Sequence, residues 1–93
     1  MTYQEKYEQL IERFIERKSL SIAIMQKEAK VGIRLAGKVY EEWKNYHDEI
    51  YWHNAIYEMS FMNEVVTPTR IMNEFGVSYY FAKKLFDYYL EQI

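Results

Sequence analysis

Residues 21–43 read SIAIMQKEAKVGIRLAGKVYEEW, and this stretch decides the fold that we expect for the chain. Ser19 or Ser21 can cap a short helix whose apolar residues recur at helical spacing. The chain then turns near Gly32, and a second apolar series follows one side of a longer helix that reaches about Tyr46. A short helix, a tight turn with glycine and a longer helix form the helix-turn-helix arrangement.

The same pattern returns 46 residues later. Aligned without a gap, residues 21–43 and 67–89 share four identical positions out of 23, and six further pairs keep size or charge. Local signals agree with this alignment, because threonine and proline open the second short helix, Gly76 can end it in a left-handed conformation and Ser78 can cap the last helix. We therefore predict a 46-residue structural pseudo-repeat.

Each helix-turn-helix has an additional helix in front of it. Residues 3–17 carry the stripe of an amphipathic helix, and residues 48–63 carry so many large apolar side chains that we expect burial on more than one side. The sequence between Trp43 and the second of these helices shows no turn-rich alternating hairpin, so we expect a helical linker and no wing. The predicted fold is all-α, with two three-helix units, 1–46 and 47–93, fused into one compact body.

The composition restricts the class of protein. The chain has 93 residues, three glycines, one proline and no cysteine, which favours one small helical protein without disulfides. It contains no apolar run long enough to span a bilayer, and its polar start lacks a signal peptide, so we expect a cytoplasmic protein without a membrane partner.

Charge is divided unequally between the two halves. Residues 1–46 hold nine Lys and Arg against seven Asp and Glu, whereas residues 47–93 hold three against seven. A basic surface can sit on phosphates and an acidic one is repelled from them, so the first unit should face any nucleic acid.

The first helix-turn-helix resembles that of the gamma domain of the FtsK/SpoIIIE DNA translocases, whose pattern is roughly S-x-x-x-L-Q-R-x-x-x-I-G-Y-N-R-A-A-R-I. The resemblance covers about a quarter of the chain and implies a DNA-binding winged helix in which the helix after the glycine enters the major groove. Arg34 and Leu35 stand where that family has Asn-Arg, and Gly37 stands at its second alanine. The residues that meet the pattern in type are Ser21, Met25, Gln26, Lys27, Val31, Gly32, Ala36, Lys38 and Val39.

We expect double-stranded DNA as the partner of the first unit, read by the helix 32–43. Arg34 can donate two hydrogen bonds to a guanine edge, the lysines can contact phosphates, and small or apolar residues allow close approach to the groove. Ser21, at a helix N-terminus, can also meet a phosphate. The candidate DNA-binding residues are Ser21, Lys27, Lys30, Ile33, Arg34, Gly37 and Lys38.

The second unit is richer in tyrosine and poorer in positive charge on the equivalent face. Such a surface is typical of protein contacts, so we interpret Tyr79, Tyr80, Lys83 and Lys84 as a dimer or partner contact. The expected function is a small DNA-binding regulator of transcription or replication. The alternative is a protein-interaction module without DNA binding, such as a small phage or mobile-element inhibitor of a host protein.

Two further sequence patterns, one typical of a nucleotide site and one of a metal site, are weaker than the helix-turn-helix pattern. The G-x-x-x-x-G-K spacing from Gly32 to Lys38 is that of a phosphate-binding loop, but the next residue is Val39 where a hydroxyl is needed, and no strand pattern precedes it. Glu49 and His53 have i, i+4 spacing suitable for two metal ligands, yet acidic residues at a helix start are equally explained by the helix dipole. We expect no enzyme activity, nucleotide, metal or other cofactor.

Overall fold

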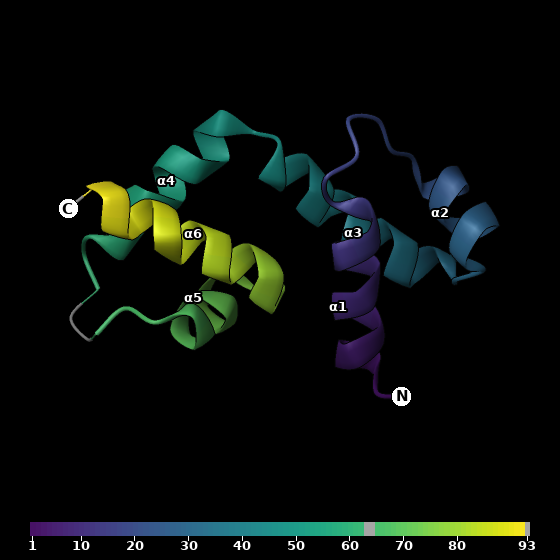
Figure 1. Cartoon of the computed structure of the whole chain (residues 1–93), viewed down its shortest axis with the longest axis horizontal. Coiled ribbons are helices and arrows are strands. Elements are labelled where there is room, and N and C mark those ends of the chain that lie inside the picture. Colours follow the sequence, from purple (N-terminus) through teal and green to yellow (C-terminus); the bar gives the residue numbers. More distant parts are fainter. Residues whose placement is uncertain (63–64, 93) are drawn as a thin grey trace. The chain divides into compact units, whose positions relative to one another are not determined.

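A computed structural model of the chain describes residues 1–62 and 65–92, and the regular structure among them is entirely helical (Figure 1). The chain divides into two compact units, Met1–His47 and Asp48–Ile93, here called unit one and unit two. Unit one contains α1 (Tyr3–Phe14), α2 (Ile22–Ala29) and α3 (Ile33–Tyr46). Unit two contains α4 (Glu49–Met59), α5 (Pro68–Phe75) and α6 (Tyr79–Gln92). The predicted all-α fold class is confirmed.

Helix α1 begins as a capping box and ends earlier than expected. The Thr2 hydroxyl accepts from the Glu5 backbone N–H, and the Glu5 carboxylate accepts from the Thr2 N–H. The expectation that the helix runs to Arg17 is wrong, because α1 ends at Phe14. The next carbonyls are satisfied from α3 instead: the Trp43 indole N–H donates to Arg17 O at 2.7 Å, and His47 Nε2 contacts Ile15 O at 2.7 Å.

The core of unit one lies where α3 meets both α1 and α2. Apolar side chains from all three helices are buried there, and Phe14, Met25 and Val39 are fully enclosed. The inward side of α3 agrees with the expected stripe, since Leu35, Ala36 and Val39 are buried and its aromatic residues are half-buried.

The linker and the first helix of unit two differ from expectation. The predicted helical linker is wrong, because His47 leaves helical geometry and Asp48 is extended. Asp48 caps α4 by accepting from the Ile50 N–H at 3.0 Å. Helix α4 ends at Met59, short of the expected residue 63, which lies outside the described residues.

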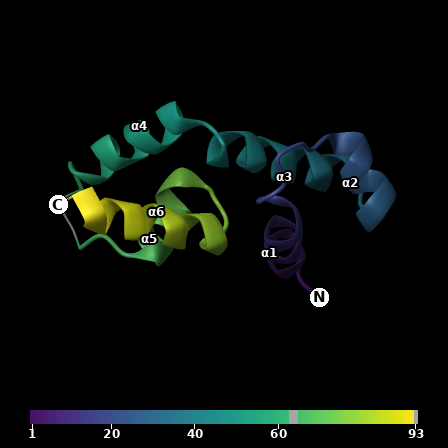
Figure 2. The ribbon, with the colours of Figure 1, turned by 45° about the horizontal axis from the view of Figure 1, so that its top comes forward.

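Burial of α4 on more than one side is also wrong. Ala55 and Met59 are buried, whereas Ile50 and Tyr57 on the other side of the helix are exposed. Helix α4 packs on α6, which in turn packs along α5 (Figures 1 and 2). A unit of this size has too few residues to cover both sides of a helix.

The helix caps and the left-handed turn of unit two are as predicted. Thr67 caps α5 with Pro68 in the first turn, Gly76 ends α5 in the left-handed region at φ 64°, and the Ser78 hydroxyl accepts from the Phe81 N–H at 3.1 Å.

Helix boundaries follow the 46-residue offset between the units. Helix α5 begins and ends 46 residues after α2, and α6 stands in the same relation to α3. Lys30, which corresponds to Gly76, is also left-handed, with φ 52°. The first helices of the two units, α1 and α4, do not share a burial pattern at this offset, because Tyr7 is buried and its counterpart His53 is exposed. The pseudo-repeat of whole units therefore stays a prediction.

The left-handed turn of unit one leads to a stability prediction. A side chain at positive φ costs about 1 kcal/mol relative to glycine. We therefore expect Lys30→Gly to raise the free energy of unfolding of unit one by about 1 kcal/mol, and Gly76→Ala to lower that of unit two by a similar amount. Urea denaturation of both variants measures these changes. A loss of stability in Lys30→Gly would contradict the strain assigned to this turn.

Candidate nucleic-acid interface

The candidate interface is built on the turn between α2 and α3. Ser21 caps α2 by accepting from the Ile24 N–H at 3.1 Å, so only its hydroxyl hydrogen remains for another acceptor. Lys30 closes α2, and Gly32 begins α3 in an extended conformation, as expected for a glycine N-cap. Gly32 therefore lies at the start of α3, and Lys38 lies on its exterior. The element before α3 is a helix, whereas a phosphate-binding loop follows a strand.

The outer side of α3 is open over its first turns. Ile33 is 67% exposed and Arg34 is exposed beside it. A Cβ added at Gly37 would meet nothing within 4 Å, so this position leaves free space on the helix surface. These three predicted residues share one accessible stretch of backbone.

The predicted lysines differ in their surroundings. Lys27 and Lys30 are exposed at the end of α2 and in the turn. The Lys38 ammonium lies 4.6 Å from the ring centroid of Tyr7 and 5.5 Å from that of Tyr3. Cation–π attraction therefore holds Lys38 at the α1 edge of this surface.

Arg17 neutralises the one carboxylate on α2. Its guanidinium donates two hydrogen bonds to Glu28, at 2.7 and 3.0 Å, and lies over the Phe14 ring. The hydrogen bonds from Arg17 hold the pKa of Glu28 below its usual range, and the same bonds raise the pKa of Arg17. The lysines of α2 and the turn therefore lie near a carboxylate whose charge is already compensated.

A buried polar pair lies behind Lys38. The Tyr7 hydroxyl donates to the Glu42 carboxylate, and both residues are almost fully buried between α1 and α3. Burial, reinforced by the charge of Glu42, raises the pKa of Tyr7 far above its usual range. The pair fixes the rotation of α3 against α1 and so orients the outer side of α3.

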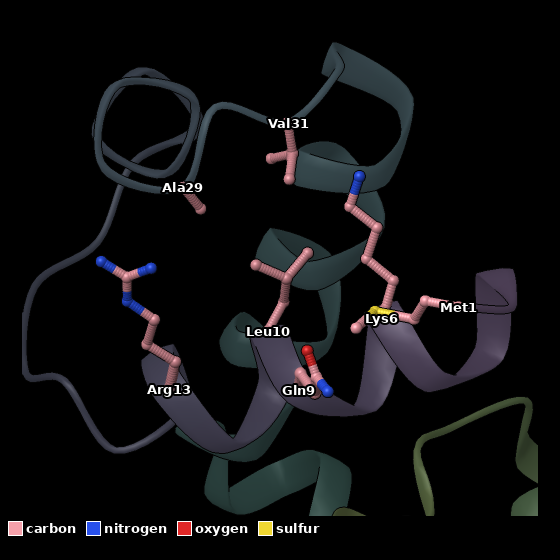
Figure 3. A pocket seen from close by; sticks show the side chains of 7 residues that line it. All are labelled: Met1, Lys6, Gln9, Leu10, Arg13, Ala29 and Val31. Carbon is pink, nitrogen blue, oxygen red and sulfur yellow. The ribbon is translucent and has the colours of Figure 1, made fainter.

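A hollow of about 290 Å³ lies between α1 and the turn, lined by Leu10, Ala29 and Val31 together with longer polar side chains. Figure 3 shows Lys6 and Arg13 reaching from α1 toward the turn on either side of Leu10. Positive charge thus extends from the turn onto α1, next to the predicted lysines.

The predicted contact residues of unit two are only partly accessible. Tyr79 is 47% exposed, and Lys83 and Lys84 are exposed on α6. Tyr80 is half-buried, with the Lys84 ammonium 5.3 Å from its ring centroid.

Several residues of this region were missed in the sequence. Lys6 and Arg13 lie on α1 and Arg17 follows after its end, in a stretch whose sequence indicates only a supporting helix, and Glu42 lies among polar residues of α3 without any local sign of burial. Spacing along the predicted helix 3–17 would place Arg13 and Arg17 one turn apart, but nothing local connects them to Glu28.

Comparison with known protein families, characterised proteins and solved structures finds no match for this chain. The FtsK/SpoIIIE resemblance therefore remains an expectation that rests on residues 21–43. Among residues 1–62 and 65–92, no three His, Cys, Asp or Glu side chains are grouped so that they could hold a metal ion. Across the same residues, every helix is too short or too polar to cross a membrane.

Proposed function

We propose that unit one binds double-stranded DNA and presents the start of α3 to the major groove. The observation that carries this proposal is the accessible stretch of Ile33, Arg34 and Gly37, which an approaching base edge could contact without displacing a side chain of the core. Residues 29–40 also hold three positive charges and no negative one.

The residues take different roles in this proposal. Arg34 donates to a guanine edge, and Ile33 offers an apolar contact such as a thymine methyl group. Lys27 and Lys30 contact phosphates on the turn side, while Lys38 reaches a phosphate from the α1 edge. The Ser21 hydroxyl can donate its hydrogen to a phosphate at the start of α2, because the cap uses only an oxygen lone pair. Such a protein would act as a regulator of transcription or replication.

The direct test measures the binding of a random-sequence duplex by fluorescence anisotropy at a series of salt concentrations. Three phosphate contacts predict that log affinity falls with log salt at a slope of about −2.7. We expect Arg34→Ala to lower affinity for a selected site by about tenfold or more, since a bidentate base contact contributes about 1 to 3 kcal/mol.

Lys38 and Lys84 provide a matched control, because they stand at equivalent positions of α3 and α6. Lys38→Ala should weaken binding at every sequence and reduce the salt slope by about one, and Lys84→Ala should change neither. Absence of binding at low salt, or equal effects of the two substitutions, would reject the proposal.

Substitutions at Gly37 test DNA binding and the stability of unit one independently. A glycine inside a helix costs about 0.5 to 1 kcal/mol relative to alanine, so Gly37→Ala should stabilise unit one by that amount. Gly37→Glu should also remain folded, because the added side chain meets open space, but its carboxylate should weaken DNA binding by about tenfold or more through repulsion from phosphates. Thermal denaturation and anisotropy of both variants test this, and undiminished binding by Gly37→Glu would remove α3 from the interface.

A second candidate function is a protein-interaction module, and the distribution of exposed apolar residues favours it. Unit two carries more of them than unit one, including Tyr79 on α6. In this reading Tyr79, Tyr80, Lys83 and Lys84 form a dimer or partner contact. Light scattering of Tyr79→Ser against the unaltered protein distinguishes a dimer contact, whose loss halves the mass, from a surface that plays no part in self-association.

A further inference from the structure

Helix α4 exposes a row of large apolar side chains. Ile50, Tyr57 and Phe61 are 69%, 68% and 65% exposed, and their spacing places them on the side of the helix opposite Met59. Phe61 lies two residues after the last residue of the helix, in a turn where its N–H donates to Glu58 O at 3.1 Å. The Tyr57 and Phe61 rings meet edge to face, with centroids 4.9 Å apart. We call Ile50, Tyr57 and Phe61 the α4 stripe.

The charged side chains in the sequence around α4 are acidic. Residues 45–69 contain four Asp and Glu and no Lys or Arg. Helical spacing places Glu49 on one side of the stripe and Glu58 on the other, and both are exposed. A second copy of α4 docked on this stripe would bring carboxylates against carboxylates, which disfavours self-association through it.

We propose that the α4 stripe docks an amphipathic helix of another protein, in which an apolar face is flanked by lysine and arginine. An apolar row along one helix matches the i, i+3, i+4, i+7 anchors of such a partner. Tyr57 and Phe61 supply large contact area at low entropic cost, and the flanking glutamates pair with the partner's basic residues. This contact lies on α4, apart from the tyrosines of α6, and does not depend on DNA binding by unit one.

The experiment uses the full chain and a fluorescein-labelled helical peptide of about 18 residues, long enough for five turns. The peptide carries leucines at i, i+3, i+4 and i+7 with lysines on both sides, and a matched peptide carries glutamates in place of the lysines. We expect saturable binding of the lysine peptide and at least about tenfold weaker binding of the glutamate peptide, because charge complementarity selects the partner.

The variant Tyr57→Ser with Phe61→Ser removes the aromatic part of the stripe. It should weaken binding of the lysine peptide by about tenfold or more while helix content and melting temperature stay within error, since both side chains are exposed in the free protein. Tyr79→Ser, which changes an exposed tyrosine outside the stripe, should bind the peptide as the unaltered protein does.

Charge reversal provides the specificity test. Glu49→Lys with Glu58→Lys should reverse the preference, so that the glutamate peptide binds more tightly than the lysine peptide. Equal binding of both peptides by the unaltered protein, or binding of neither, would overturn the proposal. So would sedimentation that shows a dimer of the protein alone, lost in the Tyr57→Ser and Phe61→Ser variant. DNA affinity should not change in these variants, so this result and that of the DNA test are independent.

Discussion

Phe81→Ala should unfold unit two under conditions in which the unaltered protein is folded. Phe81 is fully buried on α6, and its ring lies against two aromatic residues of α4, with centroids 5.7 Å from that of Tyr51 and 5.4 Å from that of Trp52. Removing a buried phenylalanine costs about 3 to 5 kcal/mol. A folded unit of this length has only about 2 to 7 kcal/mol in total, so the loss is comparable to its whole stability.

The two tryptophans make this measurable within one sample. Trp52 lies in unit two and Trp43 in unit one, so their indole N–H signals in a ¹H–¹⁵N spectrum report on the units separately. We expect the Trp52 signal to move to its unfolded position in Phe81→Ala. Phe86→Ala, a change of the same size at a half-buried position of α6, should leave that signal native. A native Trp52 signal in both variants would show that Phe81 does not hold α4 and α6 together.

Tyr7→Phe should destabilise unit one by about 1.5 to 3 kcal/mol, although it removes a single oxygen atom. The Tyr7 O–H group donates to the buried Glu42 carboxylate, and a charged acceptor that is shielded from water cannot replace the lost donor with solvent. Urea denaturation measures the change. Tyr3→Phe is the matched control, because Tyr3 lies one turn earlier on α1, is exposed and shares the contact with Lys38. Equal effects of the two substitutions would contradict the role of the Tyr7–Glu42 pair.

The same pair predicts a loss of stability at alkaline pH. Burial and the Glu42 charge raise the pKa of Tyr7 in the folded protein, whereas in the unfolded chain a tyrosine ionises near about 10. The stabilisation is therefore complete below this value and declines above it by about 1.4 kcal/mol per pH unit, because only the unfolded state releases the proton. Denaturation of the unaltered protein at pH values on both sides of 10 should show this decline, and Tyr7→Phe should lack that part of it.

Local structure could be predicted because its causes lie within a few residues. The caps at Ser21, Thr67 and Ser78 and the left-handed Gly76 each depend on atoms no more than four residues away, and the structure has all of them. Helix lengths were less predictable. Beyond the end of α1, Trp43 of α3 and the following His47 contact the carbonyls of Arg17 and Ile15, and nothing near residue 15 indicates these distant partners.

In the candidate site, too, features with local causes could be predicted and features that depend on distant residues could not. The exposure of Ile33 and Arg34 follows from the helical periodicity of α3 alone. The position of Lys38 does not, because it depends on two tyrosines of α1. Arg17 compensates Glu28 from 11 residues away, and spacing within a single helix could not have revealed that pair.

By itself the sequence determined the helical class, the two turns and the side of α3 that faces solvent, since backbone preferences, caps and periodicity act over one or two turns of chain. Only the tertiary structure decided which polar residues are buried and which apolar residues are not. Tyr7 meets Glu42 across 35 residues, and Ile50 and Tyr57 of α4 stay exposed although the sequence of this helix favours burial on more than one side. Burial depends on how much surface the neighbouring helices can cover, and in a unit this small α6 covers one side of α4 and leaves the other to solvent.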